Sequence, residues 1–187
     1  KTGVQYHKNE LKLHEYQLYF DDQNNLKIPS IESWYNNDYT HYPEQISAYF
    51  QDKIEIEDMI VNAGLRYDYF NPDGKMPSNF YDTKNAAKLD AASSWKLSPR
   101  LGIAYPITDQ GVIHFSYGHF FQVPNYEYLY INPEFEVSLV QLKGDQPPRG
   151  RYNIMGNAEL KPEKTVSYEL GLKQALSNLI SIDLTVY

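Results

Sequence analysis

Histidine is the side chain that most often binds transition metals, and this chain contains five histidines. His114 and His119 are five residues apart, and His7 and His14 are seven apart, so on a strand each pair points to opposite faces. Neither pair makes the local ligand set that zinc needs, and no spaced run of carboxylates indicates a calcium loop. The sequence therefore predicts no metal site and no cofactor.

Nucleophilic and phosphate-binding motifs are the next chemistry to consider. The chain has no cysteine, and it has no G-x-S-x-G, H-E-x-x-H or glycine-rich phosphate loop. The segment Asp73-Gly74-Lys75 lacks the preceding glycine of a phosphate-binding loop and predicts a turn instead. We therefore expect that the protein is not an enzyme.

Tyrosine and arginine side chains give the best candidates for ligand binding. Tyr126, Tyr128 and Tyr130 follow a predicted strand at the point where it meets a long loop, and aromatic faces there can stack on sugars, chelates or peptides. Arg149 and Arg151 lie in the same loop and could bind an anionic ligand. An aromatic belt and a solvated loop tip are the simpler interpretations, and both stay open.

The composition limits the class of protein. The chain has 187 residues, a net charge of -7 and a mean hydropathy of -0.60, although it contains 18 tyrosines and 8 phenylalanines. An acidic chain is not a general nucleic-acid binder, because phosphate contacts need a basic face. Tyrosine favours strands and interfaces where one end of the ring is wet. The composition therefore indicates either half-buried strands or a binding surface.

Apolar and polar residues alternate with a period of two along most of the chain, which predicts strands and no helix of comparable strength. Each of the clear strands has one apolar face and one face of small, polar and charged groups. This pattern fits a soluble sandwich or a transmembrane barrel equally well. The seven predicted strands are residues 2–20, 43–57, 59–70, 96–107, 112–122, 163–175 and 179–187.

The connections distinguish these two folds. Short connections at 57–58, 108–111 and 176–178 alternate with long irregular stretches at 21–42, 71–95 and 123–162. Compact soluble domains rarely contain three such loops, whereas outer-membrane barrels have short turns at one rim and long loops at the other. The predicted strands of about 10–12 residues also suit a tilted membrane crossing. The sequence thus favours an all-β, antiparallel up-and-down meander that forms part of a barrel.

Several segments then resemble one known family, the TonB-dependent receptors. Residues 156–165, GNAELKPEKT, lead into residues 167–171, SYELG, and this is similar to the family's G-N-x-x-L-K-P-E-x-T segment with its Y-E-x-G strand. Residues 43–52 and 62–68 resemble the family's Y-x-Q-D and G-x-R-Y-D hairpin. Residues 97–102 and 116–124 are also similar to barrel segments, in the expected order, and the variant looks most like receptors of the Bacteroidetes type.

The resemblance implies a fold, a location and partners. It implies a partial receptor barrel over residues 1–187, from a 22-stranded transmembrane barrel of the bacterial outer membrane, without the plug domain or the TonB box in this chain. It implies energy-dependent, TonB-coupled uptake of a nutrient such as an iron chelate, cobalamin, glycan or peptide. The implied partners are outer-membrane lipid, the plug, the TonB complex and the nutrient ligand, and no nucleic acid.

The polar face of the strands is the lumen side in this interpretation. In the family, inner groups hydrogen-bond the plug, so these residues are expected to be structural or plug-contacting before they are ligand contacts. Gly171 leaves room where the plug or a neighbouring side chain comes close. The expected lumen-facing residues are Arg66, Asp68, Arg100, Glu169 and Lys173.

Two other functions remain as alternatives. A soluble, tyrosine-rich β-domain that binds carbohydrate would satisfy both sheet faces without lipid. An outer-membrane barrel hydrolase would need serine, histidine and acid side chains that converge from different strands, and no motif indicates them.

Overall fold

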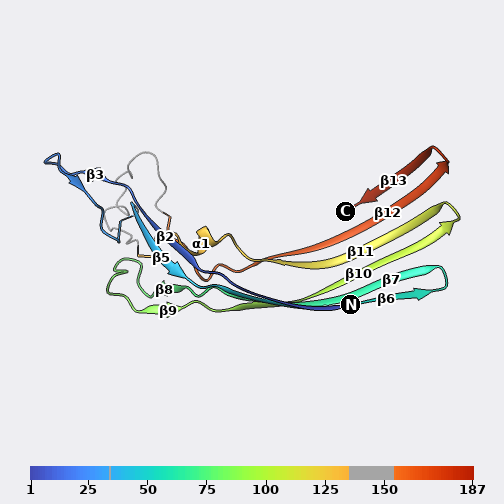
Figure 1. Ribbon diagram of the computed structural model, residues 1–187, viewed down its shortest axis with the longest axis horizontal. Helices are drawn as coiled ribbons and strands as arrows, with labels where there is room; N and C mark the ends of the chain where they lie inside the picture. Colours follow the sequence, from blue (N-terminus) through green and yellow to red (C-terminus); the bar gives the residue numbers. More distant parts are fainter. Residues whose placement is uncertain (34, 135–153) are drawn as a thin grey trace.

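The protein is built around one antiparallel sheet of seven strands (Figure 1). The computed structural model describes residues 1–33, 35–134 and 154–187. The strands pair in chain order, and the predicted up-and-down meander is confirmed. No helix among the described residues has the length and apolarity to cross a membrane. The seven strands are β1 (Thr2–Lys8), β6 (Glu44–Ile56), β7 (Met59–Asn71), β10 (Ser94–Thr108), β11 (Gly111–Gln122), β12 (Glu163–Ser177) and β13 (Ile180–Val186).

The register places apolar residues side by side on one face and polar residues on the other. One row across the sheet is Ile54, Val61, Ile103, Phe115, Leu170 and Val186. A neighbouring row on the opposite face is Gln51, Gly64, Arg100, Gly118 and Ser167. Because side chains alternate along a strand, this pairing segregates the two residue classes over the whole sheet. Many large side chains of the apolar face are exposed, among them Phe50, Leu97 and Leu170, and others such as Ile103 and Phe115 are half-buried.

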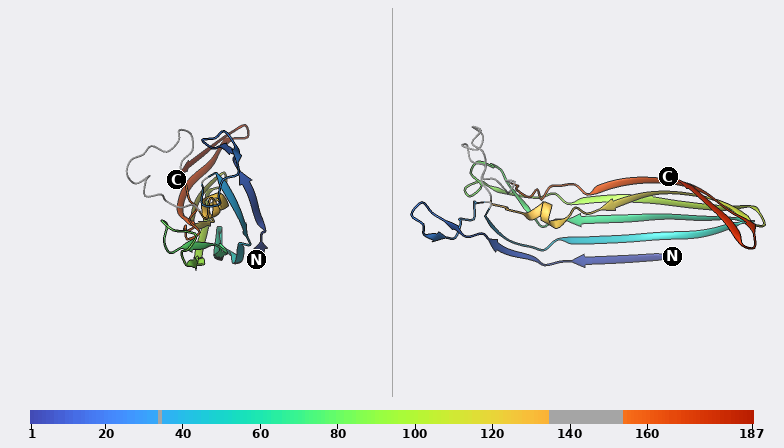
Figure 2. Two further views of the ribbon diagram at one scale, coloured as in Figure 1. Left: turned by 90° about the vertical axis from the view of Figure 1, so that its left-hand side faces the viewer. Right: turned by 90° about the horizontal axis from the view of Figure 1, so that it is seen from above.

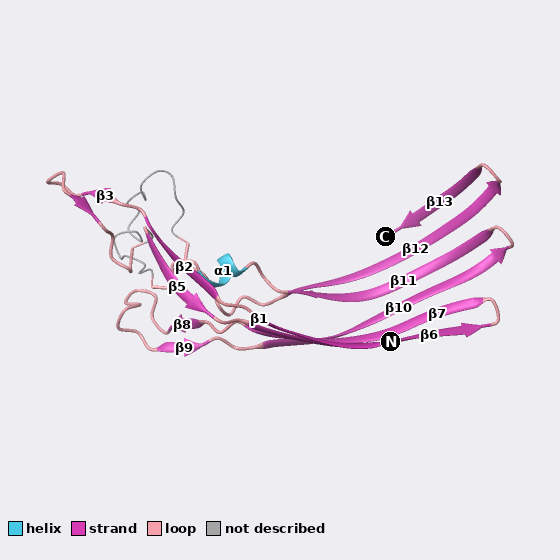
Figure 3. Cartoon of the chain, viewed as in Figure 1, coloured by secondary structure: helices cyan, strands magenta, loops and turns pink. Residues whose placement is uncertain are grey.

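Three tight turns lie together at one end of the sheet, the turn end, and the long connections lie at the other, the loop end (Figures 1 and 3). The turns are at residues 57–58, 109–110 and 178–179. Glu57 has a φ of 52°, in the left-handed region that a two-residue hairpin turn requires. The predicted alternation of short and long connections is confirmed.

The first predicted strand and the loop after it were assigned incorrectly. Residues 2–20 form three strands, β1, β2 (Leu11–Tyr16) and β3 (Tyr19–Phe20), and the stretch 21–42 contains β4 (Leu26–Lys27) and β5 (Asn36–His41). The strand pairs β1–β6 and β2–β5 have the same register, so they form one long hairpin. Its strand pairing is interrupted at Pro43, which has no N–H to donate. This hairpin therefore continues beyond the sheet as a narrow arm (Figure 3).

The other two long connections also contain regular structure, contrary to the expectation of irregular loops. Residues 71–95 contain β8 (Lys75–Pro77) and β9 (Lys88–Asp90), and residues 123–162 contain a short helix, α1 (Tyr126–Tyr130). Polar composition concealed the β8–β9 pair, which is only three residues long on each side.

The packed core of the described residues lies at the loop end. Phe70, Leu129 and Tyr130 form one buried cluster, and Ala158 is buried as well. The partly buried residues packed against the cluster are Leu11, Tyr39, Phe121, Val123 and Tyr126. These residues come from the long connections and from the strand ends beside them. The long connections and the sheet therefore pack against one another in a single core.

Candidate binding site: a polar trough and a loop cap

The polar face of the sheet lines an open trough of about 600 Å³. The sheet is curved across its strands (Figure 2). Three glycines line the trough, Gly64, Gly102 and Gly118, and they leave space there because they have no side chain. The polar lining residues include Gln51, Asn62, Arg66, Arg100, Ser116, Ser167 and Glu169.

Arg66 and Asp68 form the best-organised polar group in the trough. The Arg66 Nε lies 2.9 Å and 3.0 Å from the two carboxylate oxygens of Asp68, and the Ser47 hydroxyl donates to Asp68 Oδ1 over 2.9 Å. Asp68 is buried, so its charge needs these partners. This group therefore fixes the wall between β6 and β7, and it uses the Nε–H of Arg66 together with both oxygens of Asp68.

Arg100 differs from Arg66, because it forms no ion pair among the described residues. Its guanidinium lies 5.1 Å from the centroid of the Phe120 ring, which is a cation–π contact. The planar donor groups of Arg100 remain directed into the trough. Lys96 lies nearby and donates to the Phe120 carbonyl over 3.4 Å.

Glu169 faces His114 across β11 and β12, with 3.4 Å between Oε1 and Nε2. The His114 ring lies over Gly171, where any β-carbon would collide with it. The close neighbour at Gly171 is therefore a side chain of the same sheet. Lys173 is next on this face, between Val112 and Asp183. The five expected lumen residues thus share the polar face, and their contact with a plug stays a prediction.

The tyrosine run follows β11 at the start of the long connection and forms the short helix α1, so its three rings do not lie on one face. Asn125 caps the helix, since its side chain accepts from the Glu127 N–H over 3.1 Å. Tyr126 and Tyr130 are one turn apart and stack at 6.1 Å, whereas Tyr128 points away and is 60% exposed. The Pro124-Asn125 pair was the signal in the sequence that could have revealed the helix.

Tyr130 and Tyr126 are held by the protein itself. Tyr130 is 1% exposed, its hydroxyl donates to the Pro72 carbonyl, and its ring stacks on His41 at 4.2 Å. Burial raises the pKa of Tyr130 well above its usual range. The Tyr126 hydroxyl accepts from Gln45 over 2.8 Å and from Asn9 over 3.1 Å. Of the three rings, Tyr128 alone presents a free face.

The G-N-x-x-L-K-P segment attaches its loop to α1. The Gly156 N–H donates to the Ile131 carbonyl over 2.6 Å, and a β-carbon on Gly156 would lie 2.7 Å from backbone atoms of Leu129. The Asn157 N–H donates to the Tyr128 carbonyl over 2.8 Å. Ala158 packs directly over Gly74 of another connection. The motif therefore acts as a structural clamp between two loops.

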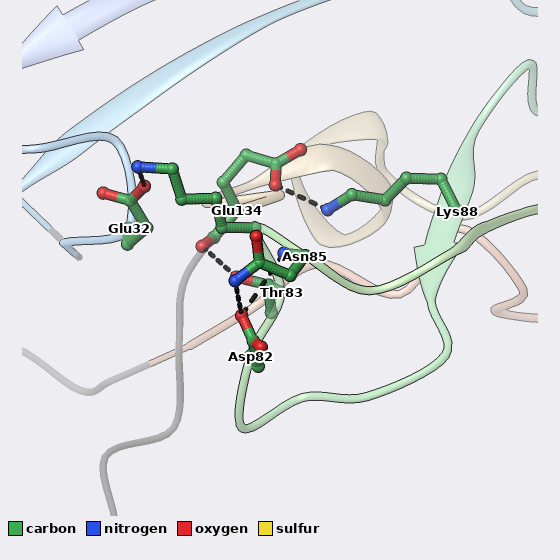
Figure 4. Close-up of polar contacts among 7 residues, drawn as sticks. Glu32, Asp82, Thr83, Asn85, Lys88 and Glu134 are labelled. Atoms are coloured by element: carbon green, nitrogen blue, oxygen red, sulfur yellow. Dashed lines mark hydrogen bonds and ion pairs between the residues drawn. The ribbon is translucent and has the colours of Figure 1, made fainter.

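Polar contacts complete this assembly of loops, which we call the loop cap (residues 11–42, 71–93, 123–134 and 154–162 of the described chain). Thr83 donates to the Glu134 carbonyl over 2.6 Å, and Lys88 lies 2.5 Å from the Glu134 carboxylate (Figure 4). Lys84 pairs with Glu32 at 3.3 Å, and neighbouring hydrogen bonds lower the pKa of Glu32. The cap thus joins three connections that are distant in the sequence.

The structure does not give the positions of two candidate ligand-binding residues. Arg149 and Arg151 lie outside the described residues. Within the described residues, no group of three or more histidine, aspartate and glutamate side chains is arranged to hold a metal ion. Sequence reasoning also missed Asn9, Gln45 and His41, whose roles depend on contacts with distant segments.

An antiparallel, curved sheet with an exposed apolar outer face and a polar inner trough is the construction of a β-barrel wall. The chain matches the family described as TonB dependent receptor-like, beta-barrel, over residues 2–187, and it belongs to that family. The members of this family are receptors and transporters and not enzymes.

A similar solved structure is that of a protein named Copper transporter OprC. The TM-score is 0.53 at 17% sequence identity, and the alignment covers 94% of this chain and 25% of that chain. Identity this low shows the fold alone. The chain spans about a quarter of the length of that protein. No match was found among curated proteins.

Proposed function

We propose that this chain is a seven-stranded part of the wall of a TonB-coupled transporter in the bacterial outer membrane. Membership of the receptor family supports this, and so does the segregation of the two sheet faces. The single observation that carries the proposal is the exposed apolar face, which continues across all seven strands. A face of this size in water would be far larger than the apolar patches that monomeric soluble proteins expose.

The strand lengths agree with this placement. β6, β7, β10, β11 and β12 are 12 to 15 residues long, and a tilted membrane-crossing strand needs about 9–11. The additional residues extend each strand beyond the apolar band toward the loop end. The full barrel would contain 22 strands, with the plug inside it.

The trough would face the plug. Arg66 and Asp68 are already paired, so we assign them to the wall itself. Arg100 has guanidinium donors left over and would hydrogen-bond plug groups, as would Glu169 and Lys173. The TonB complex would then pull on the plug to open a path for the nutrient.

The loop cap would take part in ligand capture at the cell surface. Among the described tyrosines of α1, Tyr128 is the one available to stack on a ligand. An iron chelate, cobalamin, a glycan and a peptide all have flat or apolar faces that suit such a ring. The wall and the cap make and break no bond in the nutrient.

Cysteine accessibility tests this proposal. Because the chain has no cysteine, single cysteines can be placed at Phe50 and Leu170 on the apolar face and at Asn62 and Ser116 in the trough, within a cysteine-free full-length parent. In outer-membrane vesicles with the plug domain deleted, a polar maleimide should label the trough positions and spare the apolar ones. The parent should also fractionate with the outer membrane and migrate faster on a gel unboiled than boiled.

Equal labelling of both faces, together with a soluble parent that is indifferent to boiling, would overturn the proposal. The soluble carbohydrate-binding domain would then be the leading function.

A further inference from the structure

A polar hollow of about 410 Å³ opens on the outer face of the sheet at the loop end, on the opposite side from the trough. Lys8, Glu44 and Asn71 stand directly opposite one another on β1, β6 and β7 and form its base. Tyr42 and Asp73 complete its lining. The hollow therefore belongs to the lipid-side surface and not to the lumen.

Its position on the strands corresponds to the level of lipid headgroups. The next outward row toward the turn end is Tyr6, Ile46, Tyr69 and Trp95, a row rich in aromatic residues. Barrels place aromatic girdles at the boundary between the hydrocarbon and headgroup layers. The hollow lies one row beyond this girdle, so it is next to headgroups if the sheet crosses a membrane as proposed above.

The groups around the hollow are held in place before any ligand arrives. Glu44 Oε1 accepts from Lys8 Nζ over 2.9 Å and from the Tyr6 hydroxyl over 3.1 Å. Asp73 has a φ of 49°, and its Oδ2 accepts from the Tyr42 N–H over 2.7 Å. The Asp73 carbonyl also contacts His41 Nδ1 at 2.7 Å. Both carboxylates are therefore fixed by the protein.

Hydrogen-bonding capacity remains at the same atoms. Lys8 has three N–H donors and gives one to Glu44, and its side chain is 53% exposed. Glu44 Oε2 and Asp73 Oδ1 accept no hydrogen bond from the described residues. One ammonium beside two carboxylates and an amide suits a ligand that carries both a phosphate and hydroxyl donors. A bare anion is disfavoured, because the two carboxylates repel it.

We propose that this hollow binds the phosphorylated sugar headgroup of a membrane glycolipid. Lys8 donates to the phosphate, Glu44 and Asp73 accept hydrogen bonds from sugar hydroxyls, and the Asn71 amide N–H groups donate to sugar oxygens. The exposed Tyr42 ring contacts the sugar face. The inference rests on the proposed membrane placement. The same chemistry occurs in a free sugar phosphate, but the hollow opens beside the acyl-chain layer, which favours the lipid.

Binding is tested with the full-length parent purified in detergent. The probes are a diphosphorylated disaccharide glycolipid, the same lipid without its phosphates, and phosphatidylglycerol, with native mass spectrometry as the readout. The phosphorylated glycolipid should bind best, and Lys8→Gln should weaken it about tenfold, since one hydrogen bond to a charged group is lost. Lys8→Arg, which keeps the charge, should restore most of the affinity.

Lys53→Gln is the matched control, because Lys53 also pairs with a glutamate of β6, Glu55, but near the turn end. This variant should bind the glycolipid like the wild type. Equal binding of the three lipids, or no effect of Lys8→Gln, would overturn the proposal. If the sugar phosphate without acyl chains binds equally tightly, the ligand of the hollow is a free sugar phosphate and not a lipid. Gel migration of the same samples before and after boiling tests the barrel separately.

Discussion

The two ends of the sheet are stabilised in different ways. Toward the turn end, the strands carry backbone ladders and exposed apolar side chains, and no described residue there forms part of a packed hydrophobic core. At the loop end, Phe70, Leu129 and Tyr130 are buried, and hydrogen bonds from Tyr130 to Pro72 and from Asn132 to Asn37 join three long connections around them. The wall therefore depends on its surroundings, whereas the loop cap stabilises itself.

This difference separates the roles of similar residues. Leu129 and Leu170 are both large and apolar, but Leu129 is buried in the cap and Leu170 is exposed on the outer face. Truncation at the first position should create a cavity, while a change at the second alters contact with the surrounding medium. Substitutions at matched positions in the wall and in the loop cap can therefore test this difference.

The largest effect is expected at Tyr130. Tyr130→Ala removes a buried ring and its bond to Pro72, and it should destabilise the loop cap by about 3–5 kcal/mol. Tyr128→Ala should leave the cap unchanged, because that ring is exposed. Limited proteolysis of the folded parent measures the difference. Similar cleavage rates for both variants would contradict a self-packed cap.

A charge on the outer face should have the next largest effect. Leu65→Lys places an ammonium in the apolar band and should cost about 2–4 kcal/mol of folding free energy in lipid. Ser116→Lys places the same group in the polar trough, where the cost should be small. Urea titration in lipid vesicles, followed on unboiled gels, measures both. If Ser116→Lys costs as much as Leu65→Lys, the assignment of the faces is wrong.

Replacing glycine by alanine should destabilise the protein to different extents at Gly156 and at Gly171. Gly156→Ala meets backbone atoms of α1 that cannot move aside, and it should loosen the cap by about 1–3 kcal/mol. Gly171→Ala meets the His114 ring, which can rotate away, so its effect on the wall should be smaller. Proteolysis of the cap and urea titration of the barrel give the two values. The reverse order would show that the motif does not clamp the loops.

The smallest effect concerns pH. Burial raises the folded-state pKa of Tyr130 above its ordinary value of 10.0, so the folded cap retains a proton that the opened cap releases. This contribution to stability is complete below pH 10 and declines as the pH rises above 10. Protease resistance of the wild-type cap should therefore fall above pH 10, and it should fall less steeply in Tyr130→Phe. If protease resistance falls equally steeply with pH in the wild type and in Tyr130→Phe, ionisation of Tyr130 does not cause the loss of stability.

The wall was largely predictable from the sequence, because period-two alternation and register are local properties of a strand. The predicted strand 59–70 corresponds to β7 (Met59–Asn71), and 163–175 to β12 (Glu163–Ser177). The polar positions of these strands, Arg66 and Glu169 among them, follow from the same alternation. The break after Lys8 was missed, since its cause is Pro43 on the partner strand.

The loop cap was not predictable in this way. α1 is a single turn and a half whose tyrosines also fit strand alternation, and its stability comes from contacts with residues far away in the sequence. The Tyr126 hydroxyl bonds Asn9 and Gln45, and Asn132 donates to the Asn37 side chain over 2.9 Å. Neither contact has a local signature.

In the proposed membrane placement, one face of this sheet contacts lipid and the other faces a polar lumen. Nitroxide spin labels at each position from 97 to 104 along β10, in the vesicle-reconstituted parent, test it directly by their collision rates with oxygen and with a polar nickel chelate. Oxygen accessibility should peak at the odd-numbered positions 97, 99, 101 and 103, and chelate accessibility at the even-numbered positions between them. A profile without a period of two, or chelate access at Leu101 and Ile103, would contradict the account.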